Sequence, residues 1–144
     1  MDAIRHRLLT PAHAALLGQF LRFGIVGTLG FVVDAAVVYA LRGSLGLYGA
    51  RAVSFAVGVT FTWALNRAWT FRGRGDQPLH RQWALFVAAN SGGAALNIGT
   101  YVILVASVPF CAANPILPVA AGAIAGMFVN FALSRAVVFR ARRP

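Results

Sequence analysis

The chain contains no lysine and very little acid. Of its 144 residues, 13 are basic, all of them arginine, and only three are Asp or Glu. Hydrophobic residues make up 59% of the chain, the mean hydropathy is +0.72, and the stretch from Gln82 to Ser134 has neither a charged residue nor a histidine. This composition excludes an ordinary soluble domain, and the length leaves no room for a separate catalytic domain.

Residues for catalysis or metal binding are equally scarce. The single Cys111 allows no internal disulfide, and the three histidines, His6, His13 and His80, share no metal-ligand spacing. The chain also lacks a nucleophile–base set and a phosphate-binding loop. We therefore expect neither an enzyme nor a metal or cofactor site.

The arginines are distributed very unevenly. Only Arg42 and Arg51 lie in the first expected outer connection, and the second has none. The others flank the apolar runs on the opposite side: Arg5, Arg7, Arg22, Arg67, Arg72, Arg74, Arg81, Arg135, Arg140, Arg142 and Arg143. This bias predicts that both termini and the middle loop are cytoplasmic. The net charge of +10 is then explained by topology and by attraction to anionic membrane lipids rather than by nucleic acid.

Four apolar runs are each long enough to cross a bilayer as a helix. They predict spans at about residues 20–41, 51–71, 83–107 and 118–139, outer turns at 43–49 and 109–118, and an inner loop at 73–82. Residues 1–18 are too polar for a cleavable signal peptide, and Thr10-Pro11 is typical of a helix start. Residues 1–19 are expected to be a cytoplasmic and interfacial lead-in. The chain is thus predicted to be a single all-α, multi-pass membrane domain over residues 1–144.

The sequence repeats itself. Residues 66–72 (NRAWTFR) resemble residues 134–140 (SRAVVFR), 68 positions later. At the same offset, Ser54, Gly58, Thr62 and Asn66 align with Gly122, Gly126, Asn130 and Ser134. At an offset of 63, Phe20, Phe23, Gly30 and Asp34 align with Trp83, Phe86, Gly93 and Asn97. We therefore expect two parallel helical hairpins, repeat one at 20–72 and repeat two at 83–140.

Small residues recur at helical spacing within the spans, as they do where membrane helices pack closely. We expect helix packing at Gly27, Gly30, Ser54, Gly58, Gly122 and Gly126. The same face continues toward the cytoplasmic end as polar residues: Thr62, Asn66, Asn130 and Ser134.

Asp34 is the only acid within a predicted span, about 18 Å from its inner end. A carboxylate at that depth costs about 2.5–3.5 kcal/mol unless it is paired, protonated or hydrated. In repeat two Asn97 replaces Asp34 and Val119 replaces Arg51, so the two charges disappear together. An Asp34–Arg51 pair explains this, although Arg51 could instead extend to the outer headgroups.

The remaining polar residues allow two interpretations. The amides of Asn66, Asn90, Asn97 and Asn130 suit interhelical hydrogen bonds, and they also suit a sugar, which needs both donors and acceptors. Arg67 and Arg135 occupy equivalent positions at the inner ends of the second and fourth spans. Each could hold a lipid phosphate with its guanidinium or could serve only as a topology anchor.

Three segments together resemble the GtrA-like family: residues 20–27 (FLRFGIVG), Asp34, and residues 66–71 (NRAWTF). The resemblance covers about residues 18–140. It implies a four-helix protein of the bacterial cytoplasmic (inner) membrane that moves a polyprenyl-phosphate-linked sugar to the outer leaflet for cell-envelope polysaccharide synthesis. Repeat two departs from the motif at Ser134 and Val137, which favours the first hairpin as the chemically important one.

On this interpretation, the headgroup site comprises Thr62, Asn66, Arg67, Asn130, Ser134 and Arg135. Four helices are few to enclose a path, so a homodimer or a partner subunit is expected. Two other functions stay open. The protein could be a non-transporting anchor or scaffold for a glycosyltransferase, or it could export a small solute if Asp34 has no fixed cation beside it.

Overall fold

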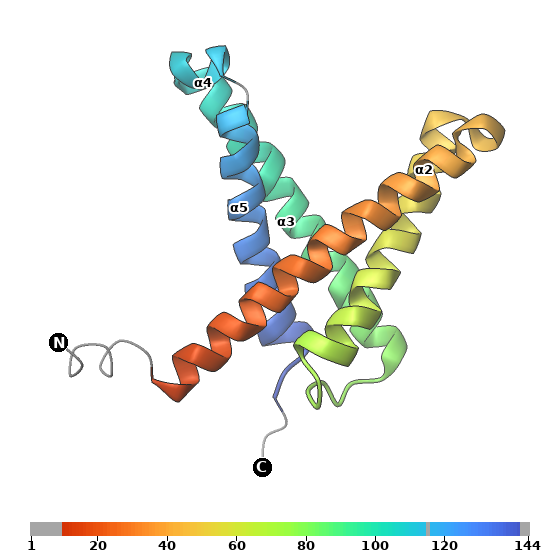
Figure 1. Ribbon diagram of the computed structural model, residues 1–144, viewed down its shortest axis with the longest axis vertical. Helices are drawn as coiled ribbons and strands as arrows, with labels where there is room; N and C mark the ends of the chain where they lie inside the picture. Colours follow the sequence, from red (N-terminus) through yellow and green to blue (C-terminus); the bar gives the residue numbers. More distant parts are fainter. Residues whose placement is uncertain (1–9, 115, 142–144) are drawn as a thin grey trace. The chain divides into compact units, whose positions relative to one another are not determined.

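The computed structural model describes residues 10–114 and 116–141, which are predominantly helical and include no strand (Figure 1). The chain divides into two compact units, Met1–Gly73 and Arg74–Pro144. The division falls within the predicted loop 73–82, so each unit holds one of the two sequence repeats. The helical character predicted from the sequence is confirmed.

The first unit consists of α2 (Pro11–Leu65) followed by the π-helical turn η1 (Asn66–Thr70). Thr10 caps the start of α2, where its Oγ1 accepts a hydrogen bond from the backbone N–H of His13 at 3.4 Å. Residues 11–19 are helical, as expected, but they continue into the first apolar run without a break. The apolar face of this run favours one long helix over a separate segment at the membrane surface.

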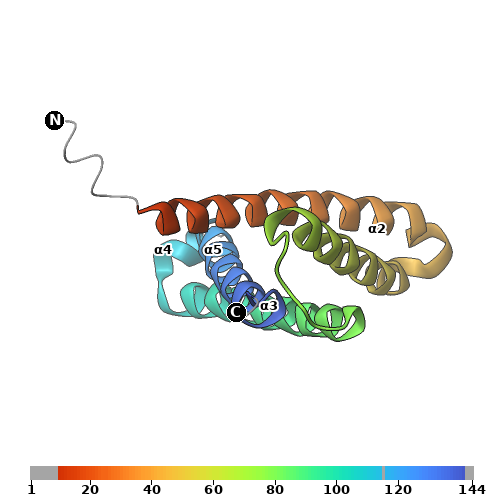
Figure 2. The ribbon, with the colours of Figure 1, turned by 90° about the horizontal axis from the view of Figure 1, so that it is seen from below.

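α2 folds back on itself at Gly46, the one residue within it whose backbone is not helical (φ 68°). Its two arms, residues 11–45 and 47–65, lie side by side (Figures 1 and 2). The turn predicted at residues 43–49 is therefore much shorter than expected. A glycine accepts this positive φ without strain, so a single residue reverses the chain.

The second unit consists of α3 (Leu79–Ser107), the short α4 (Pro109–Ala113), α5 (Ile116–Leu133) and the π-helical turn η2 (Ser134–Val138). α3 and α5 pack against each other along the hairpin (Figures 1 and 2). The connection predicted at residues 109–118 is partly helical, since α4 occupies its first half.

In the first unit, the two arms of α2 approach each other at glycines. A side chain at Gly30 would overlap Cγ2 of Thr62, and a Cβ at Gly58 would lie 3.5 Å from Cβ of Asp34 and 3.7 Å from the carbonyl oxygen of Gly30. Gly27 differs, because a Cβ there would meet nothing within 4 Å. Gly30 and Gly58 therefore lie at the helix contact, whereas Gly27 is exposed.

The second unit repeats this contact at the aligned positions. A Cβ at Gly93 would overlap the side-chain amide of Asn130, and a Cβ at Gly126 would lie 2.8 Å from the carbonyl oxygen of Gly93. At Gly122 a Cβ would lie 2.6 Å from the carbonyl oxygen of Asn97. Each glycine lets two helix backbones approach closely, as in many membrane helix pairs.

A pair of phenylalanines closes one end of each hairpin. Phe23 and Phe71 stack edge to face in the first unit, with ring centroids 6.2 Å apart. Phe86 and Phe139 do the same in the second unit at 6.1 Å. All four rings are buried. The positions that repeat in the sequence thus make matching packing contacts in the two units.

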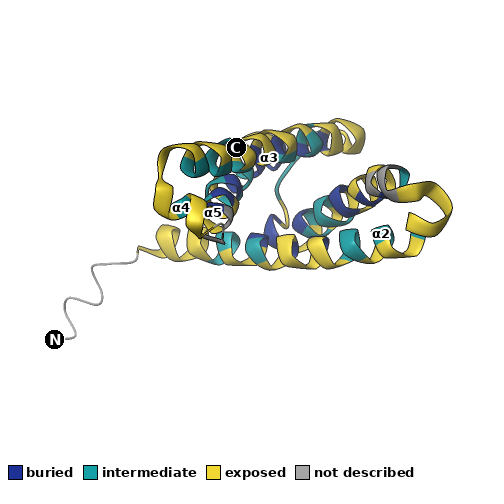
Figure 3. Ribbon diagram, turned by 90° about the horizontal axis from the view of Figure 1, so that it is seen from above, coloured by how far each residue is buried: buried dark blue, intermediate teal, exposed yellow. Residues whose placement is uncertain are grey.

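Much of the ribbon is exposed (Figure 3), and many of the exposed residues have large apolar side chains. Two described stretches, Pro11–Gly46 and Ala120–Val138, are long and apolar enough to cross a membrane, with 11% and 28% of their most apolar windows buried. A core helix of a soluble protein would be mostly buried, so this exposure favours contact with lipid. The count of four spans and their orientation stay predictions.

Candidate functional site

Each hairpin ends in one π-helical turn. The backbone N–H of Phe71 donates to the carbonyl oxygen of Asn66 at 2.8 Å, and that of Phe139 donates to Ser134 at 2.7 Å. These bonds span five residues and widen the helix, a geometry that is rare and often found at functional sites. The turns carry both copies of the repeated NRAWTFR-like segment, so the sequence similarity coincides with the unusual backbone.

Buried polar side chains lie within these turns. Asn66 is 1% exposed and Ser134 is fully buried. The Oδ1 of Asn66, the Oγ1 of Thr70 and the Oγ of Ser134 have no hydrogen-bond partner in the described part of the chain. An unsatisfied buried polar group costs about 1–3 kcal/mol, so these atoms are a marked feature of both turns. In this structure Asn66 and Ser134 lie beneath the surface and are not open to a ligand.

The other polar residues expected at the site mostly bond to their own helices. Thr62 Oγ1 donates to the carbonyl oxygen of Gly58 at 3.0 Å, and Asn90 Nδ2 donates to that of Phe86 at 2.9 Å. Asn130 lies against Gly93, and Asn97 lies against Gly122. The structure thus places Thr62, Asn97 and Asn130 at helix contacts, and all four residues are half-buried.

Arg67 and Arg135 occupy the second position of η1 and η2, and both are half-buried. The end of each hairpin around these arginines is here called its mouth, and the residues of the two mouths differ. In the first unit the guanidinium carbon of Arg22 lies 6.0 Å from the ring centroid of Trp69, a cation–π contact. Leu85 and Val137 stand at the aligned positions of repeat two, so the contact is specific to the first mouth.

An open, shallow apolar surface runs along one face of the second arm of α2. Its residues are Ala52, Val53, Ala56, Val57, Thr60, Phe61 and Ala64. The hydroxyl of Thr60 donates to the carbonyl oxygen of Ala56 at 2.7 Å, so it adds little polarity to this surface. Arg67 follows Ala64 by three residues and therefore continues the same helix face. The apolar surface is thus followed by a cationic side chain.

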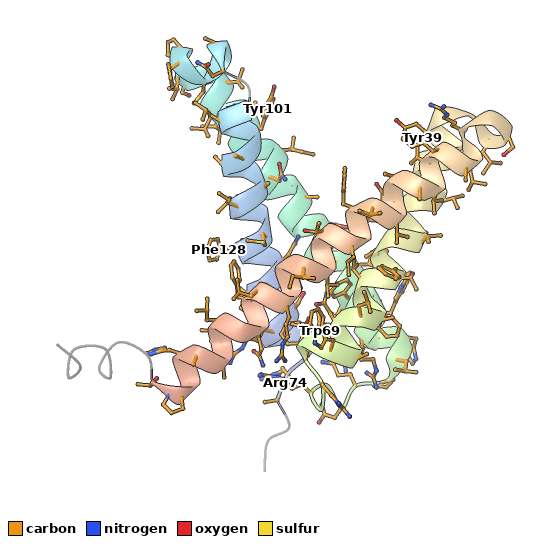
Figure 4. All side chains as sticks on the ribbon, in the orientation of Figure 1. Tyr39, Trp69, Arg74, Tyr101 and Phe128 are labelled. Carbon is orange, nitrogen blue, oxygen red and sulfur yellow. The ribbon has the colours of Figure 1, made fainter. Side chains whose placement is uncertain are left out.

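The loop after Gly73 holds a cluster that the sequence did not reveal. Arg74 Nε donates to the carbonyl oxygen of Phe139 at 3.1 Å, and Gln77 Nε2 donates to that of Val137 at 3.0 Å. The N–H of Gly75 donates to the carbonyl oxygen of Arg140 at 3.0 Å. These bonds tie the loop to the end of η2, where carbonyl groups lack helical partners. Figure 4 labels Arg74 beside this segment.

Arg74 is half-buried there, and its electrostatic setting is unusual. Desolvation by burial lowers the pKa of Arg74, and the positive charge of Arg135 lowers it further. The bonds from the loop to Val137, Phe139 and Arg140 place Arg74 at the end of the turn that contains Arg135. The sequence suggested only that Arg74 belongs to the basic inner rim.

Gln82 is a second residue that sequence reasoning missed. It is fully buried, and a side chain at Gly75, whose φ is 83°, would overlap its Nε2. Gln19 occupies the aligned position in repeat one, and an aromatic residue follows in both copies. The repeat was thus the one signal in the sequence that could have singled out Gln82. Without it, a glutamine at the end of a span resembles an ordinary interfacial residue.

Asp34 is half-buried, and its Oδ1 would lie 3.9 Å from a Cβ at Gly58. The side chain of Arg51 falls outside the described residues, so the Asp34–Arg51 pair stays a prediction. Within residues 10–114 and 116–141, no group of three or more His, Cys, Asp or Glu side chains could hold a metal ion.

The whole arrangement has a counterpart among known protein families. Residues 22–143 match the model of the family described as GtrA/DPMS, transmembrane domain. The match includes both glycine contacts, both phenylalanine pairs and both π-helical turns. This agrees with the resemblance carried by residues 20–27 and 66–71. The chain therefore belongs to the GtrA/DPMS transmembrane-domain family.

Proposed function

We propose that the protein moves a polyprenyl-phosphate-linked monosaccharide across the bacterial cytoplasmic membrane, for glycosylation of cell-surface polysaccharide or lipopolysaccharide. Membership of the GtrA/DPMS family makes it a membrane protein of polysaccharide or glycolipid sugar metabolism. The apolar surfaces of its helices agree with that setting. The substrate and the transbilayer movement are the proposed part.

The observation that carries the proposal is the apolar face of α2 that is followed by Arg67. A polyprenyl phosphate has a long apolar chain and one anionic end. The open apolar surface from Ala52 to Ala64 suits the chain, and the guanidinium of Arg67 suits the phosphate. One end of the site is thus apolar and the other cationic, in the order that the substrate requires.

The charge and shape of the mouth also suit a glycosylated phosphate. A phosphodiester carries a single negative charge, which one guanidinium group can hold while the route to lipid stays open. Trp69 is 42% exposed beside Arg22, and tryptophan rings commonly lie at the level of lipid headgroups. Asn66 is buried in η1, where its carbonyl oxygen accepts from Phe71, and Thr62 lies at the contact with Gly30.

A transbilayer assay with the full chain reconstituted in vesicles tests the proposal. We expect Arg67→Ala to reduce both glycolipid binding and transport by tenfold or more, because a charge-assisted hydrogen bond contributes about 1.5–3 kcal/mol. Arg67→Lys should recover only part of the loss, since it restores the charge but not the planar fork. Ala56→Trp, which places a large ring on the apolar surface, should reduce transport without removing charge.

The matched control is Arg72→Ala. Arg72 is exposed and lies five positions after Arg67, so its removal changes the basic rim equally. If the two alanine variants behave alike, the rim serves only topology and the headgroup site at Arg67 is wrong. If the wild-type protein moves no glycolipid but retains a glycosyltransferase in the membrane, the scaffold function replaces transport.

A further inference from the structure

We propose that Tyr39 and Arg42 form a second headgroup site, which receives the glycosylated phosphodiester at the opposite end of the first hairpin from Arg67. The identity of this ligand rests on the proposed function. Both residues lie in the first arm of α2, shortly before the turn at Gly46. Figure 4 labels Tyr39 near this turn and Trp69 at the other end of the hairpin.

The side chains of Tyr39 and Arg42 are in direct contact. The guanidinium carbon of Arg42 lies 4.6 Å from the centroid of the Tyr39 ring, a cation–π contact. A guanidinium above a ring still has N–H donors for an anionic oxygen. The contact also restricts its orientation, and fixing a long side chain in advance reduces the entropy lost on binding a ligand. Arg42 thus offers an anion a positioned group of donors.

The same combination of residue types occurs at the other end of this hairpin. There the guanidinium carbon of Arg22 lies 6.0 Å from the centroid of the Trp69 ring. At both ends the arginine and the aromatic residue are exposed. In repeat two, aliphatic residues stand at all the aligned positions, with Val102 and Val105 as the counterparts of the proposed site. An arginine–aromatic pair at each end is therefore specific to the first hairpin.

The spacing of the two pairs matches the thickness of a bilayer. Arg22 and Arg42 are 20 residues apart in one continuous helical arm, which corresponds to about 30 Å. The hydrocarbon core of a bilayer is also about 30 Å thick. Asp34 is the only charged residue between the two arginines. When this arm crosses the membrane, one guanidinium group therefore lies at each headgroup layer.

The topology signal does not account for Arg42. Arginines gather on the predicted cytoplasmic side, where they favour the orientation of the spans. Arg42 lies toward the opposite side, where a positive charge weakens this bias. A ligand at the outer surface gives this arginine a role that the topology signal does not.

The chemistry of the pair identifies the class of ligand. One guanidinium group matches the single negative charge of a phosphodiester and can bind its oxygens. The Tyr39 side chain is 68% exposed, so its ring and its hydroxyl can both reach a ligand. The hydroxyl can donate and accept hydrogen bonds, as sugar hydroxyl groups require. Arg42 thus binds the phosphate and Tyr39 the sugar, at the surface where a transported glycolipid arrives.

Three probes with one prenyl chain test this division of roles: farnesyl phosphoglucose, methyl farnesyl phosphate and farnesol. Binding is measured to the full chain in nanodiscs of neutral lipid, in an Arg67→Ala background that removes the inner headgroup site. We expect Arg42→Gln to weaken both phosphodiesters about tenfold and to leave farnesol unchanged, because it removes a charge-assisted hydrogen bond. Tyr39→Leu should weaken only farnesyl phosphoglucose, about threefold, because methyl farnesyl phosphate has no sugar.

Two matched variants separate a ligand site from a membrane anchor. Phe31→Leu removes another exposed ring from the same arm and should leave the binding of all three probes unchanged. Arg42→Lys keeps the positive charge, which suffices for anchoring or for the helix dipole, and should recover only part of the lost affinity. Full recovery with Arg42→Lys, or an equal loss of both phosphodiesters with Tyr39→Leu, would overturn the site.

Competition by phosphatidylglycerol distinguishes the glycolipid from bulk anionic lipid. We expect it to displace farnesyl phosphoglucose only in large molar excess, and displacement at equal concentrations would make Arg42 an ordinary headgroup contact. Transport by the chain with intact Arg67 is a separate measurement. If that transport persists while Arg42→Gln leaves binding unchanged, this inference alone is wrong. Binding that depends on Arg42 without any transport overturns only the proposed function.

Discussion

At the scale of single residues, neighbouring glycines on one helix have different surroundings. Gly27 and Gly30 lie about one turn apart in α2, but a side chain at Gly27 would meet open space and one at Gly30 would meet Thr62. The sequence treats the two positions alike, because both belong to one small-residue stripe. Only the contact with the other arm of α2 distinguishes them.

This difference gives a prediction for Gly30→Ala. Overpacking at the helix contact should destabilise the protein by about 1–3 kcal/mol. Gly27→Ala should instead be neutral or stabilising by up to about 1 kcal/mol, since alanine favours helix. Unfolding of the purified protein in detergent measures both.

A second substitution should rescue Gly30→Ala, because the new Cβ would overlap a single side-chain atom, Cγ2 of Thr62. Thr62→Ser removes Cγ2 of Thr62 and should restore most of the lost stability in the double variant. Gly126→Ala has no comparable rescue, because its new Cβ would meet the backbone of Gly93. Equal effects of Gly27→Ala and Gly30→Ala would contradict the described helix contact.

Arg74 and Gln82 could not be singled out from the sequence, and the physical reason is the same for both. Arg74 lies in a polar loop among other arginines, where the pattern indicates only a topology signal. Its importance comes from a bond to Phe139, 65 positions away in the chain. Likewise, the buried Gln82 lies against Gly75, a contact that local hydropathy does not indicate. Contacts between distant segments determine both cases.

At the scale of elements, the loop between the two repeats is hydrogen-bonded to the end of η2. Gly73 and Gly75 both have positive φ, 76° and 83°. A side chain at Gly73 would meet nothing within 4 Å, whereas one at Gly75 would meet Gln82. The two positions therefore share a positive φ but differ in packing.

Substitution of these glycines separates strain from packing. Gly73→Ala should cost about 1–2 kcal/mol, since a left-handed backbone is unfavourable for alanine. Gly75→Ala should cost about 1–3 kcal/mol more, because the new methyl group displaces buried Gln82. Denaturant unfolding of the two variants gives the difference. Equal losses would mean that the loop does not pack on Gln82.

The elements also show what hydropathy can and cannot locate. The apolar runs correctly indicated long helices, and the repeated segments at 66–72 and 134–140 marked the ends of both hairpins. The turn at Gly46 was predicted too long, because hydropathy falls gradually around it while the backbone reverses at one residue. The π-helical turns have no signature in periodicity, since they involve only five residues each.

At the scale of the whole molecule, each unit has its own glycine contact and its own buried phenylalanine pair. The repeat makes the two hairpins similar in packing, while the residues at their mouths differ. The Arg22–Trp69 contact is found in one unit, and the bonds from Arg74 and Gln77 to the end of η2 are found in the other. The duplicated scaffold therefore has unlike ends.

The number of spans is the prediction that tests the molecule as a whole. Two stretches, Pro11–Gly46 and Ala120–Val138, meet the combined test of length and hydropathy. If only these cross the membrane, Ser44, Asp76 and Ala112 lie on one side. If four spans cross with both termini inside, Ser44 and Ala112 are outside and Asp76 is in the cytoplasm. The arginine distribution favours four spans.

Cysteine labelling in intact cells distinguishes the two topologies. All three positions are exposed, and the half-buried native Cys111 is first replaced by serine. We expect an impermeant thiol reagent to label Ser44→Cys and Ala112→Cys directly, and Asp76→Cys only after the cells are made permeable. Labelling of all three from outside would leave two spans. Labelling of Asp76→Cys alone would reverse the orientation and place Arg67 and Arg74 at the outer surface, away from a substrate made in the cytoplasm.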